Sequence, residues 1–242
     1  MSGGAGFVAK TMALTRKDLR TELRGRDTLP PMLAFAIAVT VLLAFVLPGD
    51  ARIGEPVDLP VGAVSTAAVL AGFLYVTILF AGLIGFARTF EIEREEGAID
   101  ALLLAPLDRS GLFFSKAVAN LVYLLSVEAL VVPVFALLFG FDLGARWLVL
   151  ILVLILVDLG FVAVGTLFAS LAAQTRSREL MLPILALPIL VPIFIAGTQL
   201  TGDLLLGGGL EAVASRGWFG ILIAFDAIFV TVGALAFEFV VE

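Results

Sequence analysis

Cysteine and histidine are both absent from the 242 residues of this chain. Without cysteine there is no disulfide, no thiolate metal site and no thiol nucleophile. Without histidine there is no Ser-His-Asp triad, no imidazole ligand for a metal ion, and no side chain whose ordinary pKa lies near neutrality. A membrane-embedded enzyme is therefore the weakest hypothesis. We expect no catalytic residues, no cofactor-binding residues and no metal ligands in this chain.

Charge is also scarce. Charged residues make up 15% of the chain and hydrophobic residues 61%, with a mean hydropathy of +1.15. Soluble domains carry about 25% charged residues and no more than about half apolar ones. The polar residues are too few to cover a globule in water. The composition predicts an all-α integral membrane protein, and we expect residues 1–242 to form a single transmembrane domain.

Six stretches are long enough to cross a bilayer, since a helical span needs roughly 20 mainly apolar residues. They lie at residues 29–47, 62–87, 112–139, 147–172, 180–199 and 218–239. Pro183, Pro188 and Pro192 fall inside the fifth stretch and predict a helix that is kinked or partly unwound. Residues 200–217 are glycine-rich and too short to span, so they form either an external loop or a shallow re-entrant segment.

Lys and Arg are unevenly distributed between these spans. Twelve of them lie before the first span, between the second and third, or between the fourth and fifth, whereas three lie in the alternate loops. Short cytoplasmic loops carry an excess of Lys and Arg. The bias predicts that both termini are cytoplasmic.

Residues 7–26 have the periodicity of an amphipathic helix. Its apolar stripe is Val8, Met12, Leu19 and Leu23, and its basic stripe is Lys10, Lys17, Arg20 and Arg24. A helix of this kind lies in the membrane interface, with its cations near anionic lipid headgroups. The alternative is that these charges only set the topology.

Carboxylates inside the spans are the main polar feature of the membrane region. Glu128 and Asp158 lie near the centres of the third and fourth spans, and Asp226 lies in the sixth. A charge at that depth costs a few kcal/mol, so such residues face the protein interior or a hydrated cavity. Either Glu128, Asp158 and the proline-rich fifth span line a translocation path or dimer seam, or each acid is neutral and bonded to a neighbouring helix.

The segment EIEREEGAIDALLLAPLDRSG at residues 91–111 is a concentrated polar stretch between two apolar spans. Its glutamates extend the second span beyond the bilayer, and Gly97 ends that helix because a residue with positive φ suits glycine. Residues 98–105 then fit a short helix along the membrane surface, which Pro106 terminates. This loop, residues 88–111, presents an acidic approach to a cytoplasmic partner.

This segment resembles the coupling-helix region of ABC-2 type permeases of the ATP-binding-cassette class. The basic N-terminal helix, six spans, the second inner loop QTRSREL and the following LMLPILALPILVPIFIAG are together similar to the CcmB family. The resemblance covers nearly the whole chain, most firmly residues 88–120 and 174–200. The acidic, Ala- and Gly-rich composition and the Gly-rich loop after the fifth span depart from that pattern.

The resemblance implies a permease subunit of the haem-exporter-like complex of cytochrome c maturation, in the plasma membrane of a prokaryote. It implies a homodimer docked on a separate ATPase subunit that holds the ATP, and a haem-handling, CcmC-like membrane partner. Haem would be the transported species, and no nucleic-acid partner is expected. The expected contacts with the ATPase are Glu93, Glu95, Glu96, Gly97, Ile99, Asp100, Leu103 and Pro106, with a lesser contact at Arg176, Arg178 and Glu179.

Two other functions remain open at this point. A generic ABC-2 exporter of lipid, drug or polysaccharide would need an ATPase but no haem-handling neighbour. A secondary carrier or channel would act alone and would favour an inverted repeat. The two halves of the chain show no convincing repeat of that kind.

Overall fold

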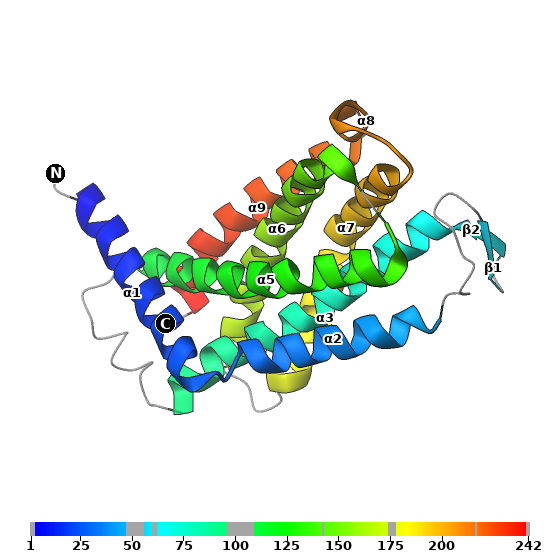
Figure 1. Cartoon of the computed structure of the whole chain (residues 1–242). Coiled ribbons are helices and arrows are strands. Elements are labelled where there is room, and N and C mark those ends of the chain that lie inside the picture. Colours follow the sequence, from blue (N-terminus) through cyan, green and yellow to red (C-terminus); the bar gives the residue numbers. More distant parts are fainter. Residues whose placement is uncertain are drawn as a thin grey trace.

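The computed structural model describes residues 3–46, 56–59, 62–95, 109–141, 143–173, 178–215 and 217–240. Its helices are α1 (Gly3–Gly25), α2 (Leu29–Ala44), α3 (Thr66–Glu95), α5 (Arg109–Phe139), α6 (Trp147–Ala173), α7 (Arg178–Leu205), α8 (Leu210–Ser215) and α9 (Gly217–Val240). A 3-10 turn, η1 (Gly144–Arg146), precedes α6. Two short strands, β1 (Pro56–Leu59) and β2 (Gly62–Ser65), form a hairpin before α3. Figure 1 shows the long helices as one elongated bundle with the hairpin at its far end.

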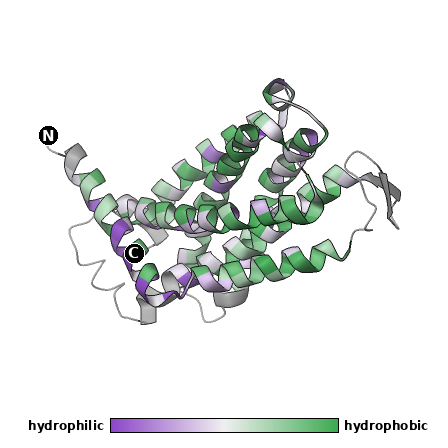
Figure 2. Ribbon diagram, in the orientation of Figure 1, coloured by the Kyte–Doolittle hydropathy of each residue, from purple (hydrophilic) through white to green (hydrophobic). Residues whose placement is uncertain are grey.

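Within the described ranges, five helices are long and apolar enough to cross a membrane. They are Thr66–Thr89, Ser110–Phe139, Gly144–Ala173, Met181–Leu205 and Gly217–Phe237. A sixth arises if α1 and α2 count together, although the pair is bent by 69°. Hydrophobic residues dominate the long helices, and hydrophilic ones gather on α1 (Figure 2). The chain is a multi-pass, all-α membrane protein, which confirms the fold class that the composition predicts.

Two spans differ from the sequence-based boundaries. Residues 62–65 were expected to be helical but form β2, whose Val64 lies opposite Val57 of β1. Glycine at position 62 weakens a helix and the β-branched Val64 suits a strand, and apolar composition alone does not reveal the antiparallel partner. In the first expected span, the helix ends at Ala44, so α2 is about 24 Å long at 1.5 Å per residue.

The bend between α1 and α2 is built from backbone contacts. Arg26 adopts φ 60° directly after Gly25, and its N–H bonds to the Glu22 carbonyl at 2.8 Å. The Glu22 carboxylate then accepts hydrogen bonds from the N–H of Thr28 at 3.1 Å and of Leu29 at 2.7 Å. The first N–H groups of a helix lack internal partners. Glu22 therefore caps α2 from the preceding helix, and the side chain of Thr28, the residue at the N-cap position, makes no capping hydrogen bond.

α6 lies at the centre of the bundle and contacts α3, α5, α7 and α9. Aromatic rings join it to two neighbours. The Phe161 ring lies 4.8 Å from that of Phe86 on α3 and 5.1 Å from that of Phe194 on α7, both edge-on. Gly82 and Gly165 leave room for these rings, because a Cβ on either would overlap Phe161 or Phe86. Small residues let membrane helices approach closely. Here the glycines make room for a layer of aromatic rings across the core, which Phe86, Phe161 and Phe194 form.

α7 is a single continuous helix although it contains Pro183, Pro188 and Pro192. Pro188 and Pro192 are exposed on its outer side and Pro183 is half-buried. Of the two outcomes predicted for this segment, partial unwinding is wrong. Each proline removes one N–H donor from the helix, but α7 continues from Arg178 to Leu205.

Residues 200–217 were left open between an external loop and a re-entrant segment. The structure instead extends α7 to Leu205, and α8 follows as a short helix. Gly207 has φ 101° and ends α7, while the Arg146 guanidinium donates to the Leu204 carbonyl at 2.8 Å. The hydrogen bond from Arg146 supplies a partner for a carbonyl in the last turn of α7, where carbonyls are otherwise unsatisfied. The positive φ of Gly207 is typical of the residue that follows a helix.

Candidate functional site

One end of the bundle gathers the features that the sequence singles out, and we call it the α1 end. It holds α1, the last turns of α3, the start of α5 and the C-terminus (Figure 1). Glu93 and Glu95 lie in the last turn of α3, and Arg178 and Glu179 begin α7. The remaining predicted ATPase contacts lie outside the described residues: Glu96, Gly97, Ile99, Asp100, Leu103, Pro106 and Arg176.

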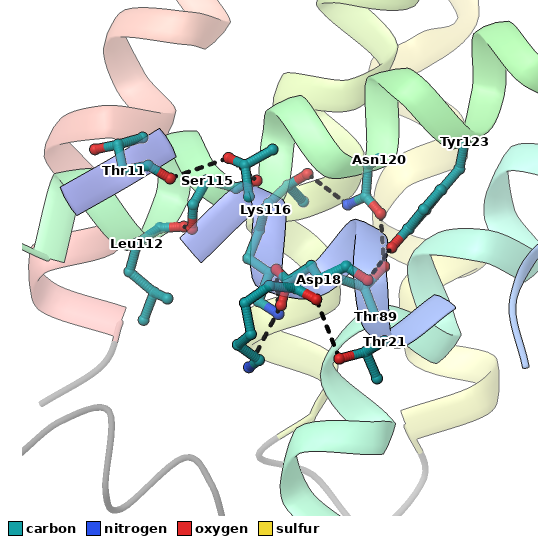
Figure 3. Close-up of polar contacts among 12 residues, drawn as sticks. Thr11, Asp18, Thr21, Thr89, Leu112, Ser115, Lys116, Asn120 and Tyr123 are labelled. Atoms are coloured by element: carbon teal, nitrogen blue, oxygen red, sulfur yellow. Dashed lines mark hydrogen bonds and ion pairs between the residues drawn. The ribbon is translucent and has the colours of Figure 1, made fainter. Parts of the chain in front are cut away.

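α1 does not simply rest beside the bundle but is bonded to α5 through a polar face. The Asp18 carboxylate forms an ion pair with the Lys116 ammonium at 2.9 Å, and the Lys116 side chain is only 3% exposed. The Thr15 hydroxyl donates to the Ser115 carbonyl at 3.3 Å, and the Tyr123 hydroxyl donates to the Asp18 carbonyl at 3.2 Å. Figure 3 shows these contacts meeting between the two helices.

We call the polar contacts between α1 and α5 the α1 seam. A small polar cavity lies behind the α1 seam, between α1, α2, α3 and α5. Its volume is about 40 Å³, and its walls include Asp18, Glu22, Thr28, Lys116 and Tyr123. A cavity needs at least about 10–15 Å³ of space open to the centre of a water-sized sphere to hold one water molecule. The junction therefore has room for water among its charged groups.

The outer surface of α1 retains the amphipathic character expected from its sequence. Lys10, Lys17, Arg20 and Arg24 are all exposed, and so is Arg16. The apolar residues Val8, Met12 and Leu23 are exposed beside them, whereas Leu19, the fourth member of the expected apolar stripe, is partly buried against the core. α1 thus has three faces, of which the polar face toward α5 was missed. The signal was present, because Thr11, Thr15, Asp18 and Glu22 recur at spacings of three and four residues.

A second polar group joins α3, α5 and α6 next to this seam. The Thr89 hydroxyl donates to Oδ1 of Asn120 at 2.6 Å, and Nδ2 of Asn120 donates to the Thr166 hydroxyl at 3.1 Å. All three side chains are buried. A single amide therefore bridges three helices at once, which sequence periodicity does not show.

Replacing Asn120 with Ala is expected to lower the free energy of unfolding by about 1–3 kcal/mol, because it leaves two buried hydroxyls without their side-chain partner. The measurement is thermal unfolding of the purified protein in mild detergent. Ser126→Ala on the same helix is the control, since among the described residues the Ser126 hydroxyl bonds to its own helix, at the Val122 carbonyl. Equal midpoints for the two variants would contradict a bridging role for Asn120.

The acids predicted for a translocation path or dimer seam lie inside the protomer. Asp158 is fully buried on α6 and Glu128 is 4% exposed on α5. Their carboxyl groups face each other within hydrogen-bonding reach. Asp226 of α9 lies on the other side of α6, where a Cβ on Gly160 would be 2.6 Å from its Oδ1. The path or seam itself stays a prediction.

No cluster of three or more His, Cys, Asp or Glu side chains that could hold a metal ion occurs in the described part of the chain. Met32 is buried, with its Sδ next to Gly85, and Met12 is exposed on α1. The described residues therefore offer three candidate functional features. They are the α1 end with its buried ion pair, the bundle of membrane helices, and the buried pair of acids.

Comparison with known proteins agrees with this architecture. A family model described as CcmB protein matches residues 9–242. The heme exporter protein B of Rhodobacter capsulatus is 31% identical over 188 residues, which cover 78% of this chain and 80% of the relative. The heme exporter protein B of Paracoccus denitrificans is 30% identical over 187 residues, which cover 77% and 80%. A match over nearly the whole chain, together with the bundle of membrane helices, shows that this protein belongs to the CcmB family.

Proposed function

We propose that this chain is the membrane-spanning, non-catalytic subunit of an ATP-binding-cassette complex that acts in cytochrome c maturation. A separate ATPase subunit hydrolyses ATP, and the complex uses that energy to transport haem or to release a haem-loaded partner. The names of the relatives, heme exporter protein B, support this cargo. The proposal places the chain in the plasma membrane with both termini cytoplasmic, which agrees with the twelve Lys and Arg on that side.

The observation that carries the proposal is the junction at the α1 end. The segment predicted to dock on the ATPase lies between Glu95, where α3 ends, and Arg109, where α5 begins. Lys116 follows two turns into α5 and is paired with Asp18 of α1. A push on the loop that moves the start of α5 therefore also moves α1, because the buried ion pair and the Tyr123 bond join the two helices.

Haem enters this proposal as cargo and not as a resident cofactor. The chain has no His or Cys to offer as an axial ligand, and its four methionines are poor candidates. Met1 and Met12 precede the spans, Met32 is buried near the inner end of α2, and Met181 lies near the inner end of α7. Axial ligands would therefore come from a haem-handling membrane partner of the CcmC-like kind.

The proposal also assigns roles to two surfaces of the bundle. The exposed Lys10, Lys17, Arg20 and Arg24 lie at the headgroup level, where anionic lipids attract them. The outward side of α7, with Pro188 and Pro192, is the proposed seam of a homodimer.

The test is to purify the chain from its own membranes in mild detergent and to identify what accompanies it. Recovery of an ATP-binding-cassette ATPase together with a haem-handling membrane protein supports the proposal. The ATPase without any haem partner would favour a generic ABC-2 exporter. Recovery of the intact, folded chain with neither protein would overturn both.

Gly97→Val and Glu96→Lys are each expected to uncouple the complex while leaving the chain in the membrane. The first adds a β-branched side chain at the predicted helix end, and the second reverses a charge in the acidic approach to the ATPase. The measurement is ATPase activity of the co-purified complex, which should fall several-fold. Unchanged assembly and unchanged activity in both variants would contradict the coupling assignment.

A further inference from the structure

Glu128 and Asp158 form a close pair of acids in the middle of the bundle, and no part of the proposed function uses them as a pair. Glu128 projects from α5 and Asp158 from α6, and their carboxyl groups are within hydrogen-bonding reach of each other. Both are almost fully buried. Within the described part of the chain, no N–H or O–H donor bonds to Oε1 of Glu128 or to either carboxyl oxygen of Asp158.

No buried cation compensates these acids among the described residues. Lys116 is the buried cation there, and it is paired with Asp18. It also lies 12 residues before Glu128 on the same helix, which is about 18 Å at 1.5 Å per residue. Two adjacent carboxylates without a cation repel each other and are poorly solvated, so full ionisation of the pair is unfavourable.

The surroundings contribute hydroxyl groups and aromatic rings. Tyr75 of α3 lies near both acids, and its hydroxyl is hydrogen-bonded to that of Thr201 on α7 at 3.0 Å. Asp226 of α9 is a further titratable group against α6, on the side of Gly160. Along α6, Phe161 lies between Asp158 and Thr166, and its ring packs edge-on against Phe86 of α3.

From this geometry we propose that Glu128 and Asp158 form one proton-binding site in the core, in which one carboxyl group donates its hydrogen to the other and ties α5 to α6. A hydrogen bond between two carboxyl groups requires that one of them carry the hydrogen. The proton comes from water, and no other bond is made or broken. Sharing one proton lets two adjacent acids coexist at low electrostatic cost.

Such a site makes the contact between α5 and α6 depend on the proton. When the proton is present, the acids attract, and the two helices are held together at mid-membrane. When it is absent, two like charges face each other and the contact is lost. α5 also makes the polar contacts with α1. Any movement of α5 relative to α6 therefore changes the distance between the two acids.

Infrared spectroscopy of the purified full chain in lipid at neutral pH tests the site directly. A protonated carboxyl group has a C=O stretch that is separate from the carboxylate and amide bands. We expect wild type minus the double variant Glu128→Gln and Asp158→Asn to show this band. Asp226→Asn, measured in parallel, identifies any part of the signal that belongs to Asp226.

Isotope labelling provides a second measurement that needs no variant. Glutamate labelled with ¹³C at its side-chain carboxyl should shift the band of wild-type protein if Glu128 carries or shares the hydrogen, and labelled aspartate should shift it if Asp158 does. If neither label and no variant changes the carboxylic-acid region, the pair holds no proton and the proposal is wrong. A band that disappears only with Asp226→Asn would overturn it equally.

Discussion

Lys116→Met is expected to lower the free energy of unfolding by about 3 kcal/mol and to release α1 from α5. The Lys116 side chain is 3% exposed and the Asp18 side chain 11% exposed, so the substitution leaves a largely buried carboxylate without its buried partner, while the exposed Lys17 remains beside it. Removing one member of a buried ion pair costs about 3–5 kcal/mol, and we take the lower end because Asp18 retains some contact with water. The measurements are thermal unfolding in detergent and protease cleavage within α1.

Lys17→Met is the matched control, because Lys17 also pairs with Asp18, at 3.4 Å, but is 44% exposed. Exposed ion pairs contribute about 0–1 kcal/mol, so this variant should unfold almost like wild type. The double variant Asp18→Asn with Lys116→Met removes both charges and should regain part of the lost stability. Similar losses for Lys17→Met and Lys116→Met would show that the buried pair has no special role in holding α1.

Gly165→Val is expected to destabilise the bundle by about 3 kcal/mol, since overpacking of a tight core typically costs about 1–3 kcal/mol and valine adds three carbon atoms. A Cβ at this position would overlap the ring of Phe86, which is itself 1% exposed and packed edge-on against Phe161. The measurement is again the thermal midpoint, together with the yield of monodisperse protein.

Gly72→Ala is the control for this prediction, because among the described residues nothing outside its own stretch of helix lies within 4 Å of the position its Cβ would take. Alanine also favours a helix over glycine by about 1 kcal/mol, so the control should be neutral or slightly stabilised. Replacing Phe86 with Leu in the Gly165→Val background should restore part of the loss. Failure of that rescue would mean that the Phe86 contact is not what Gly165 protects.

Helix locations were largely predictable because a bilayer imposes a simple requirement on composition and length. Runs of about 20 apolar residues must be helical there, since every backbone N–H and C=O has to be satisfied within the segment. That argument located the spans beginning near 112, 147, 180 and 218. It failed at residues 62–65, where pairing with β1 decides the conformation, and it overstated the effect of prolines in α7.

Contacts between helices were not predictable in the same way. The sequence shows an acidic Glu22, a lysine at 116 and an asparagine at 120, but not that the first caps α2, the second pairs with Asp18 and the third bridges three helices. Each contact joins residues whose approach depends on how the helices cross. Periodicity reports the face on which a side chain lies and not the partner it meets.

By itself, the amino-acid sequence determined that this chain is a helical membrane protein, where most of its spans lie, and which family it resembles. Those conclusions depend on composition and on order along the chain, which the bilayer converts directly into helices. Only the tertiary structure decided that α1 is bonded to α5, that glycines seat an aromatic layer around α6, and that Glu128 faces Asp158. These depend on helix crossing and close packing, where a side chain's partner comes from a distant part of the chain.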